Sequence, residues 1–278
     1  MSGVLDAHIH LWELDRVELP WFRPGLGLPE TVRLADLAAA AAPLAASPTP
    51  VPGPGPGPLT GAIAVQAGAS RAEALWLTGM CDPLLAGAVV QYDPADPDGW
   101  AVSLVGGPAR GMRVAVPDRR ADLADVAGLD AACERVAAAD GVVEFLVRAE
   151  QLDGVAAVLA RHPRTRFVLC HLGLGAGDPD VAWERGLRAV AALPNAWAKL
   201  SGIATAGDQD GSRLRTAVDV ALDAFGIHRL LFGSDWPMSA RVAPYPELVR
   251  RIGAALPPLT AEAAQGFWGG TARVLYRL

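Results

Sequence analysis

The feature that most constrains the fold is a regular alternation of short apolar runs with segments of helical spacing. Eight apolar or β-branched runs occur at residues 4–10, 61–67, 87–92, 111–116, 142–147, 166–172, 196–202 and 229–236. Segments in which apolar residues recur with helical spacing lie between them at 32–42, 71–80, 129–138, 152–161, 181–193 and 213–225. Strands that alternate with helices are typical of βαβ units, whose strands run parallel in one sheet.

Eight such units in a chain of 278 residues predict an α/β fold, a (β/α)8 TIM-type barrel that forms a single domain over residues 1–278. The alternative is a doubly wound open sheet, which normally carries a glycine-rich turn after its first strand. No GxGxxG or GxxxxGK[ST] motif follows any of the eight runs. The closed barrel is therefore the favoured fold.

Composition and charge narrow the class of protein. A net charge of −6 argues against nucleic-acid binding, which needs a basic face for phosphates. Three widely spaced cysteines without a CxxC motif predict neither a disulfide scaffold nor a structural zinc site, and they fit a reducing compartment. The N-terminus lacks the pattern of a signal peptide, and no apolar stretch is long enough to span a bilayer. We expect a cytoplasmic protein, monomeric or homo-oligomeric, whose partner is a small-molecule substrate.

The stretch 43–60 is rich in proline and glycine, and the two residues alternate strictly between 52 and 58. Collagen requires a period of three, so this period of two predicts a surface loop between a helix and the second strand. A proline-rich docking motif is the alternative interpretation.

Three of the five histidines end predicted strands. His8 and His10 are two positions apart, so on a strand they face the same side and can converge on one ion or substrate. His171 ends another run, and the carboxyl ends of the strands are where barrel enzymes place their sites. His162 and His228 stand immediately before strands, which predicts a place at the opposite end of the barrel.

The last run ends in Asp235, an acid whose burial is costly unless it is paired, bound to metal or used as a base. Ser234 beside it lacks a GxSxG elbow, so a serine nucleophile is disfavoured. Cys170 is disfavoured as a nucleophile too, because adjacent strand residues point to opposite faces and His171 would be poorly placed to activate it.

These motifs together carry a resemblance. Asp-Ala-His-Ile-His-Leu-Trp at 6–12, followed by Pro-Trp at 20–21, resembles the opening of the amidohydrolase superfamily, in particular its amidohydrolase-2 branch of sugar lactonases and pyrone-dicarboxylate lactonases. Later markers follow in family order: Val-Gln-Ala at 65–67, Gly-Met-Arg at 111–113, His-Leu-Gly at 171–173, Lys-Leu-Ser-Gly at 199–202, Phe-Gly-Ser-Asp-Trp-Pro at 232–237 and Thr-Ala-Arg-Val-Leu-Tyr at 271–276. The resemblance spans nearly the whole chain and implies a distorted (β/α)8 barrel.

The resemblance implies a hydrolase that opens a small lactone with water activated by Asp235. His8, His10 and His171 would either hold a divalent metal or polarise the scissile carbonyl directly. The implied metal set is His8, His10, His171 and Asp235, suited to one zinc or manganese ion, and metal-independent catalysis stays open. A binuclear site is not expected, because Arg113 and Glu144 stand where two-metal relatives carry a carboxylated lysine and a histidine.

Further side chains are candidates for substrate contact. Arg113 carries a planar guanidinium suited to a carboxylate or a lactone oxygen, with an ion pair to a strand acid as the alternative. Lys199 is the single lysine of the chain, which favours a role at the site. Trp12 and Trp236 flank the expected site and could stack on a ring or pack in the core. For Glu144, ligand and buried structural roles are equally compatible with its position in mid-strand.

The chain departs from the family pattern after His171. Lactonases of this branch usually continue Gly-Lys-Pro, whereas residues 173–175 read Gly-Leu-Gly, so one substrate-binding cation is missing. We therefore rank a sugar lactone ahead of a dicarboxylate lactone. The alternative functions are a metal-dependent decarboxylase of the same superfamily and a catalytically inactive barrel that binds a small molecule.

Overall fold

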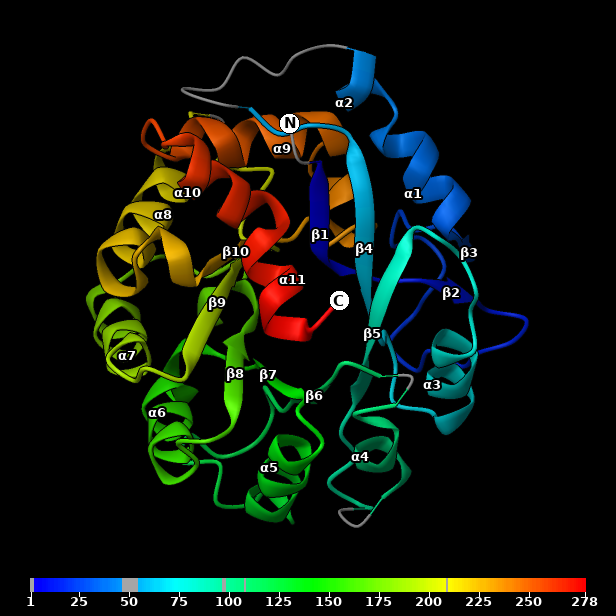
Figure 1. Cartoon of the computed structure of the whole chain (residues 1–278), viewed down its shortest axis with the longest axis vertical. Coiled ribbons are helices and arrows are strands. Elements are labelled where there is room, and N and C mark those ends of the chain that lie inside the picture. The colour runs from blue at the N-terminus through cyan, green and yellow to red at the C-terminus, as the bar shows by residue number, and fades with distance from the viewer. Residues whose placement is uncertain (1–2, 47–54, 97–98, 108, 209) are drawn as a thin grey trace.

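The computed structural model describes residues 3–46, 55–96, 99–107, 109–208 and 210–278. Eight parallel strands form one sheet in the order β1-β4-β5-β6-β7-β8-β9-β10 (Figure 1). Their bounds are β1 Val4–Ile9, β4 Leu59–Val65, β5 Leu85–Gln91, β6 Gly111–Ala115, β7 Val142–Leu146, β8 Arg166–Leu169, β9 Ala196–Leu200 and β10 Leu230–Phe232. The predicted (β/α)8 barrel is confirmed.

Helices surround the ring of strands, as Figure 1 shows. Their bounds are α1 Leu34–Ala41, α2 Pro43–Ala46, α3 Arg71–Thr78, α4 Trp100–Leu104, α5 Leu129–Ala138, α6 Leu152–Arg161, α7 Val181–Ala191, α8 Ser212–Phe225, α9 Tyr245–Ala255, α10 Ala261–Gln265 and α11 Thr271–Tyr276. Side-chain caps begin several of them. Ser70 accepts from the Glu73 N–H at the start of α3, and Asp180 accepts from the Trp183 N–H at the start of α7.

The barrel closes between β1 and the segment after β10. The Asp235 N–H donates to the His8 carbonyl at 2.8 Å, and the His10 N–H donates to the Trp236 carbonyl at 2.8 Å. A parallel bridge pairs Ile9 with Trp236. The backbone bonds that close the barrel therefore fix the predicted catalytic residues of its first and last strands relative to one another.

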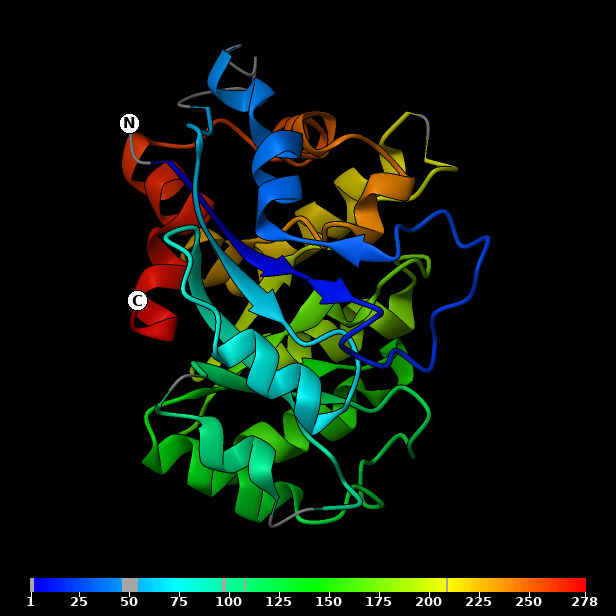
Figure 2. The ribbon, with the colours of Figure 1, turned by 90° about the vertical axis from the view of Figure 1, so that its right-hand side faces the viewer.

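The apolar residues form two clusters. The larger one lies between the strands and the surrounding helices. The smaller one fills the barrel interior with Leu5, Ala7, Ile63, Val65, Val89, Val142, Val168 and Leu231, together with Ala272, Leu275 and Tyr276 from α11. Figure 2 shows β1 and β4 running away from α11, so this helix covers the end of the barrel at which strands begin. The opposite end, where the strands finish, carries the site.

A small antiparallel sheet lies beside the carboxyl end of the barrel. It pairs β2 (Trp12–Glu13) with β3 (Thr31–Val32). The segment between these strands forms the long dark-blue loop on the right of Figure 2.

Several predicted boundaries are wrong. β8 ends at Leu169 and β10 at Phe232, several residues before the predicted ends at 172 and 236, because the chain leaves the ladder to turn its polar side chains toward the barrel axis. The predicted loop 43–60 begins with the short helix α2, since proline is tolerated in the first turn of a helix, and β4 starts at Leu59. Residues 47–54 of this loop lie outside the described residues. Among the described residues, no helix has the length and apolar character needed to cross a membrane.

Candidate active site

His8 and His10 meet at the carboxyl end of β1. Ala7 belongs to the interior cluster and Ile9 to the outer one, so the alternation of faces breaks here, where the pairing of β1 with β4 also shifts register. The two Nε2 atoms lie 3.3 Å apart. The Nδ1 atom of His10 is 2.7 Å from the Val65 carbonyl oxygen, which fixes its ring from the neighbouring strand.

His171 reaches the same point from a turn rather than from a strand. It lies in a tight 3-10 turn (Cys170–Gly173), where His171 and Leu172 have φ values of 54° and 56°. Non-glycine residues seldom adopt this left-handed conformation, and it is often found at functional sites. Its Nδ1 atom is 2.9 Å from the Ser201 hydroxyl. Gly202 passes so close that a Cβ there would stand 2.6 Å from that nitrogen.

Asp235 is the centre on which the three imidazoles converge. Its Oδ1 atom lies 3.7 Å from His8 Nε2, 3.5 Å from His10 Nε2 and 3.9 Å from His171 Nε2. Its backbone is also left-handed, with φ 61°. Burial alone would raise the pKa of Asp235, but His171, His10 and Arg113 outweigh burial and hold that pKa below its ordinary value. The carboxyl group is therefore ionised at neutral pH.

His8 and His171 are neutral at the same pH. Burial lowers the pKa of His8 well below its ordinary value, and the Lys199 ammonium lowers it further. Burial also lowers the pKa of His171, although the Asp235 carboxylate opposes this effect. The site thus combines a carboxylate that can accept a proton with neutral imidazoles that can donate hydrogen bonds or bind metal.

Arg113 enters the site from β6. Its Nε donates to the Gln91 side-chain oxygen at 3.0 Å, and its Nη2 donates to the Gln66 carbonyl at 2.6 Å. No acidic side chain of the described residues forms an ion pair with it, so the alternative prediction of an ion pair with a strand acid is wrong. Two glutamines on adjacent strands hold the guanidinium in place instead, and neither of these supports followed from the sequence.

Lys199 and Glu144 form a buried pair beneath His8. Lys199 Nζ lies 2.7 Å from Glu144 Oε1, and both side chains are fully buried. Glu144 also accepts from the Tyr276 hydroxyl at 2.6 Å and from the Cys170 thiol at 3.2 Å. Burial would raise the pKa of Glu144, but Lys199 reverses the effect and lowers it. Lys199 was a candidate for substrate contact, but it lies inside the barrel with its charge balanced by Glu144.

The tryptophans lie deeper than the sequence suggested. Trp12 is fully buried, donates to the Pro29 carbonyl at 2.9 Å and packs edge-on against Trp21. A substrate cannot stack on a ring that is already covered on all sides, so Trp12 packs in the core. Trp236 follows Asp235, is 7% exposed and belongs to the outer apolar cluster.

Asp6 is a residue that motif reasoning did not single out. Its Oδ1 accepts from the backbone N–H of His8 at 3.1 Å and of Ser234 at 2.8 Å, and its Oδ2 accepts from the Tyr245 hydroxyl at 2.9 Å. Burial raises the pKa of Asp6 to about 6, although these hydrogen bonds oppose the rise. Asp6 therefore ties β1, the segment of Asp235 and helix α9 together.

The disfavoured nucleophiles and the two remaining histidines have other partners. Ser234 is fully buried and its hydroxyl accepts from the Trp236 N–H at 2.9 Å. Burial raises the pKa of the Cys170 thiol well above its ordinary value, so a thiolate is not formed. His162 lies 2.7 Å from Asp130 on α5, and His228 lines a separate hollow with residues of α11.

A cavity of about 280 Å³ reaches the cluster at Asp235. Its lining includes the hydroxyl residues Thr205 and Ser239 and the cation Arg241, which is in the short turn after Asp235. No other basic side chain among the described residues lines this cavity. The position of Arg241 could have been inferred, because it follows the last predicted strand by only a few residues.

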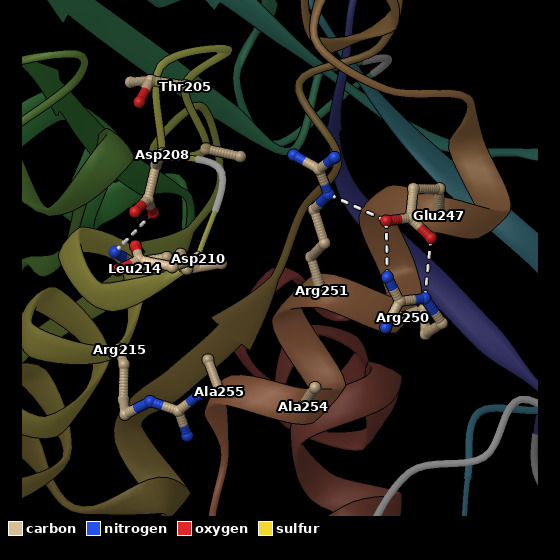
Figure 3. A pocket seen from close by; sticks show the side chains of 12 residues that line it. Thr205, Asp208, Asp210, Leu214, Arg215, Glu247, Arg250, Arg251, Ala254 and Ala255 are labelled. Atoms are coloured by element: carbon tan, nitrogen blue, oxygen red, sulfur yellow. Dashed lines mark hydrogen bonds and ion pairs between the residues drawn. The ribbon is translucent and has the colours of Figure 1, made fainter.

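A second pocket of about 300 Å³ lies between the β9–α8 connection and α9 (Figure 3). Most of its acidic groups already have partners. Asp208 accepts from the N–H groups of Arg213 and Leu214 at the start of α8, and Glu247 pairs with the arginines at 250 and 251. The imidazole cluster is absent from its lining, so the candidate site is the cavity at Asp235.

The donor set meets the distance requirement of a small metal site. His8, His10 and Asp235 each offer one ligand atom, and these atoms lie within 4.8 Å of one another. His171, the fourth predicted ligand, does not belong to this group, although its Nε2 is close to Asp235. A second group, His8, Glu144 and Cys170, satisfies the same distance, but its acid is already paired with Lys199. Two imidazoles and a carboxylate are suitable ligands for zinc.

Comparisons with known proteins agree with this geometry. Residues 5–278 match the family described as amidohydrolase. An L-fucono-1,5-lactonase of Burkholderia multivorans is 34% identical over 295 residues, which cover 99% of this chain and 96% of the relative. Two crystal structures of a Burkholderia multivorans amidohydrolase, one with bound HEPES and one with bound zinc, cover both chains fully, with TM-scores of 0.81 and 0.79 at 31% and 30% identity. The chain therefore belongs to the amidohydrolase family.

Proposed function

We propose that this chain is a lactonase that opens a sugar 1,5-lactone by adding water to its carbonyl carbon. The observation that carries the proposal is the convergence of three imidazoles on one carboxylate oxygen of Asp235 at the carboxyl end of the barrel. The relative named L-fucono-1,5-lactonase, which aligns with nearly the whole chain, supports this reaction class.

Asp235 is the proposed general base. Its lowered pKa keeps it ionised, so Oδ1 can accept a proton from a water molecule as the water oxygen attacks the carbonyl carbon. The electron pair of the carbonyl bond moves to its oxygen. When the tetrahedral intermediate collapses, the ring C–O bond breaks and the ring oxygen takes the proton back from Asp235. The product is the open hydroxy acid, and the carboxylate is restored.

Arg113, His8 and His171 are the proposed stabilisers of the oxyanion. The guanidinium is held rigidly by Gln91 and Gln66, so its orientation needs little rearrangement during the reaction. His8 and His171 are neutral and largely buried, which strengthens a hydrogen bond to developing negative charge. We propose these three groups as the hydrogen-bond donors to the carbonyl oxygen, with His10 beside them at the same end of the lactone.

If a divalent metal binds, His8, His10 and Asp235 are the residues that would hold it. A metal there would act as a Lewis acid and lower the pKa of water. His171 and Arg113 would still face the substrate, because neither belongs to that ligand group.

The cavity favours a neutral, hydroxylated ring over a dicarboxylate. Thr205 and Ser239 supply hydroxyls, whereas Arg241 is the one basic residue in the described lining. A second carboxylate would lack a partner and would lie close to the negative charge of Asp235. We therefore propose a monosaccharide lactone, with Arg241 contacting hydroxyls or the carbonyl side of the ring.

The decisive experiment is Asp235→Asn, assayed with a pH indicator on L-fucono-1,5-lactone and corrected for uncatalysed opening. Loss of a general base costs about 10²–10⁴-fold, so we expect kcat/KM to fall within or beyond that range while the thermal unfolding curve is retained. Asp118→Asn is the matched control, because that carboxyl group is 88% exposed and, among the described residues, pairs only with Arg148.

Two outcomes would overturn the proposal. An unchanged rate in Asp235→Asn would remove Asp235 as the base. Release of carbon dioxide from an aromatic acid by an enzyme that turns over no lactone would establish the decarboxylase alternative instead.

A further inference from the structure

The two imidazoles of β1 differ in where they carry their proton. Nδ1 of His10 is 2.7 Å from the Val65 carbonyl oxygen, which can only accept, so the neutral ring carries its proton there. Its Nε2 atom is then a bare acceptor. His8 Nε2 lies 3.3 Å from that acceptor, so the contact is a hydrogen bond only if His8 Nε2 carries a proton and donates.

The other side of the His8 ring leads to the same assignment independently. Its Nδ1 atom lies 3.5 Å from Lys199 Nζ. An ammonium group has donors and no acceptor, so a proton on Nδ1 would point at a positive charge. His8 and Lys199 are fully buried, which makes this repulsion stronger than it would be in water. The lone pair therefore faces Lys199 and the proton faces the site.

Lys199 is held in this position from behind. Glu144 bonds its Nζ at 2.7 Å and is itself bonded by the hydroxyl of Tyr276 on α11 at 2.6 Å. A chain of polar contacts thus runs from the helix that covers one end of the barrel to the imidazole at the other. Every member of the chain is buried.

We infer that Lys199 is a positioning residue that keeps the proton of His8 on Nε2, so that His8 faces the substrate as a hydrogen-bond donor. The catalytic meaning of this tautomer rests on the proposed function, whereas the tautomer itself does not. When a lactone binds to the metal-free protein, the His8 Nε2–H turns from His10 to the carbonyl oxygen on which negative charge develops.

The same arrangement opposes metal binding at His8. A histidine that binds metal through one nitrogen usually donates its other N–H to a carbonyl or carboxylate oxygen. His10 has this arrangement, because its Nδ1 faces the Val65 carbonyl. His8 has the reverse, a cation at Nδ1. A metal can therefore bind His8 Nε2 only if the proton leaves that nitrogen and the contact with Lys199 is given up.

The first test is 15N NMR of the metal-free full chain labelled at histidine. We expect a pyridine-type shift for Nδ1 and a pyrrole-type shift for Nε2 of His8, and the opposite pattern for His10. The signals of His8 are assigned as those absent from His8→Asn. A pyrrole-type Nδ1 on His8 in the wild type would overturn the inference. This test uses no lactone, so it is decided even if the enzyme has another substrate.

The second test measures zinc affinity, with a competing chelator, in the double variant Lys199→Met/Glu144→Gln. This variant removes the ammonium and keeps the buried layer neutral. We expect zinc to bind about tenfold more tightly or better, since partners of a ligating histidine typically change metal affinity by 10–100-fold. The preference for a proton on Nε2 of His8 should weaken in the same variant.

The control is Tyr276→Phe, which removes one hydrogen bond to Glu144 and leaves Lys199 beside His8. Its His8 shifts and zinc affinity should match the wild type. Zinc affinity that is unchanged or weaker in a folded double variant would refute the inference. If the double variant does not fold, the wild-type NMR pattern still decides the tautomer.

Discussion

At the scale of single residues, the imidazole cluster depends on two neighbouring glycines, Gly202 and Gly233, because a side chain at either position would collide with a histidine. A Cβ on Gly202 would stand 2.6 Å from His171 Nδ1, and a Cβ on Gly233 would stand 2.8 Å from the Cβ of His8. Gly202 also has a φ of 59°, a conformation that L residues rarely adopt. Gly202 follows Ser201 and Gly233 precedes Ser234, so both glycines make room for side chains of the site.

Gly202→Ala should therefore displace the His171 ring, although Gly202 is not itself a reacting group. The strained backbone costs roughly 1–3 kcal/mol, and the displaced His171 ring lowers kcat/KM by about 100-fold, the usual cost of misplacement by an ångström. Gly207→Ala, in the same connection with open space around it, is the control and should retain activity. Kinetics and urea unfolding of the two variants check this prediction. Equal activity in both would mean that His171 does not need its present position.

The sequence predicts which residues gather at the site better than how deep they lie. Because they end predicted strands, four residues were expected at one end of the barrel, and the structure brings them together: His8, His10, His171 and Asp235. The rarity of lysine drew attention to Lys199, but the sequence could not show that Glu144 lies opposite it, because contacts between strands depend on the closed barrel. Ser201 bonds His171 for the same reason and was missed.

At the scale of elements, Arg213 joins two loops that border the site. Its Nη1 donates to the Ile203 carbonyl after β9, and its Nη2 donates to the Gly175 and Gly177 carbonyls after the turn of His171. These bonds link the loop after His171, where relatives carry a lysine and this chain does not, to the loop that carries Gly202. A cation therefore reaches the altered Gly-Leu-Gly segment from α8, although its Nη1 and Nη2 groups are used by the backbone.

Arg213→Met should loosen both loops without touching the reacting atoms. We expect a higher KM and a kcat/KM reduced by about 10–100-fold, since positioning errors far from the chemistry are costly. Arg215→Met is the matched control, because Arg215 is an exposed arginine on the same helix and forms no ion pair with the described residues. Steady-state kinetics on the lactone distinguishes them. A similar loss of activity in both variants would point to the positive charge of α8 rather than to the bonds that Arg213 makes with the two loops.

Helix α9 offers a pH-dependent test. Hydrogen bonds from Arg250, with a further one from Arg251, lower the pKa of Glu247 from 4.5 to about 2. A lowered pKa in the folded state stabilises the protein above pH 4.5, and that contribution is lost as the pH falls toward 2. Because the side chain is 31% exposed, solvent screening limits the contribution at neutral pH to about 1 kcal/mol.

Glu247→Gln should accordingly be less stable than the wild type at pH 7 by about 1 kcal/mol, and the difference should vanish as the pH approaches 2. Glu134→Gln on α5, whose carboxyl group forms no ion pair with the described residues, should show no such convergence. Urea unfolding across this pH range measures both. A difference that persists at pH 2 would contradict the prediction.

At the scale of the whole molecule, the repeat of strands and helices was enough to predict a barrel. It did not predict how the barrel is closed at the end where its strands begin. The final run Thr-Ala-Arg-Val-Leu-Tyr was identified only as a family marker. In the structure it forms α11, whose Ala272, Leu275 and Tyr276 complete the interior cluster. A helix this short has no strong signal of its own, because packing across the barrel rather than local propensity stabilises it.

Sealing by α11 predicts contrasting effects at two neighbouring positions. Leu275 is 4% exposed inside the barrel, whereas Val274 is 80% exposed. Leu275→Ala should cost roughly 2–5 kcal/mol and lower Tm by at least about 4 °C, because it removes buried methyl groups and leaves a cavity. Val274→Ala should leave Tm within about a degree, as exposed positions contribute little. Calorimetry of both variants measures this contrast. Equal melting temperatures would show that α11 does not seal the barrel, and the polar chain from Tyr276 to His8 would then lose its anchor.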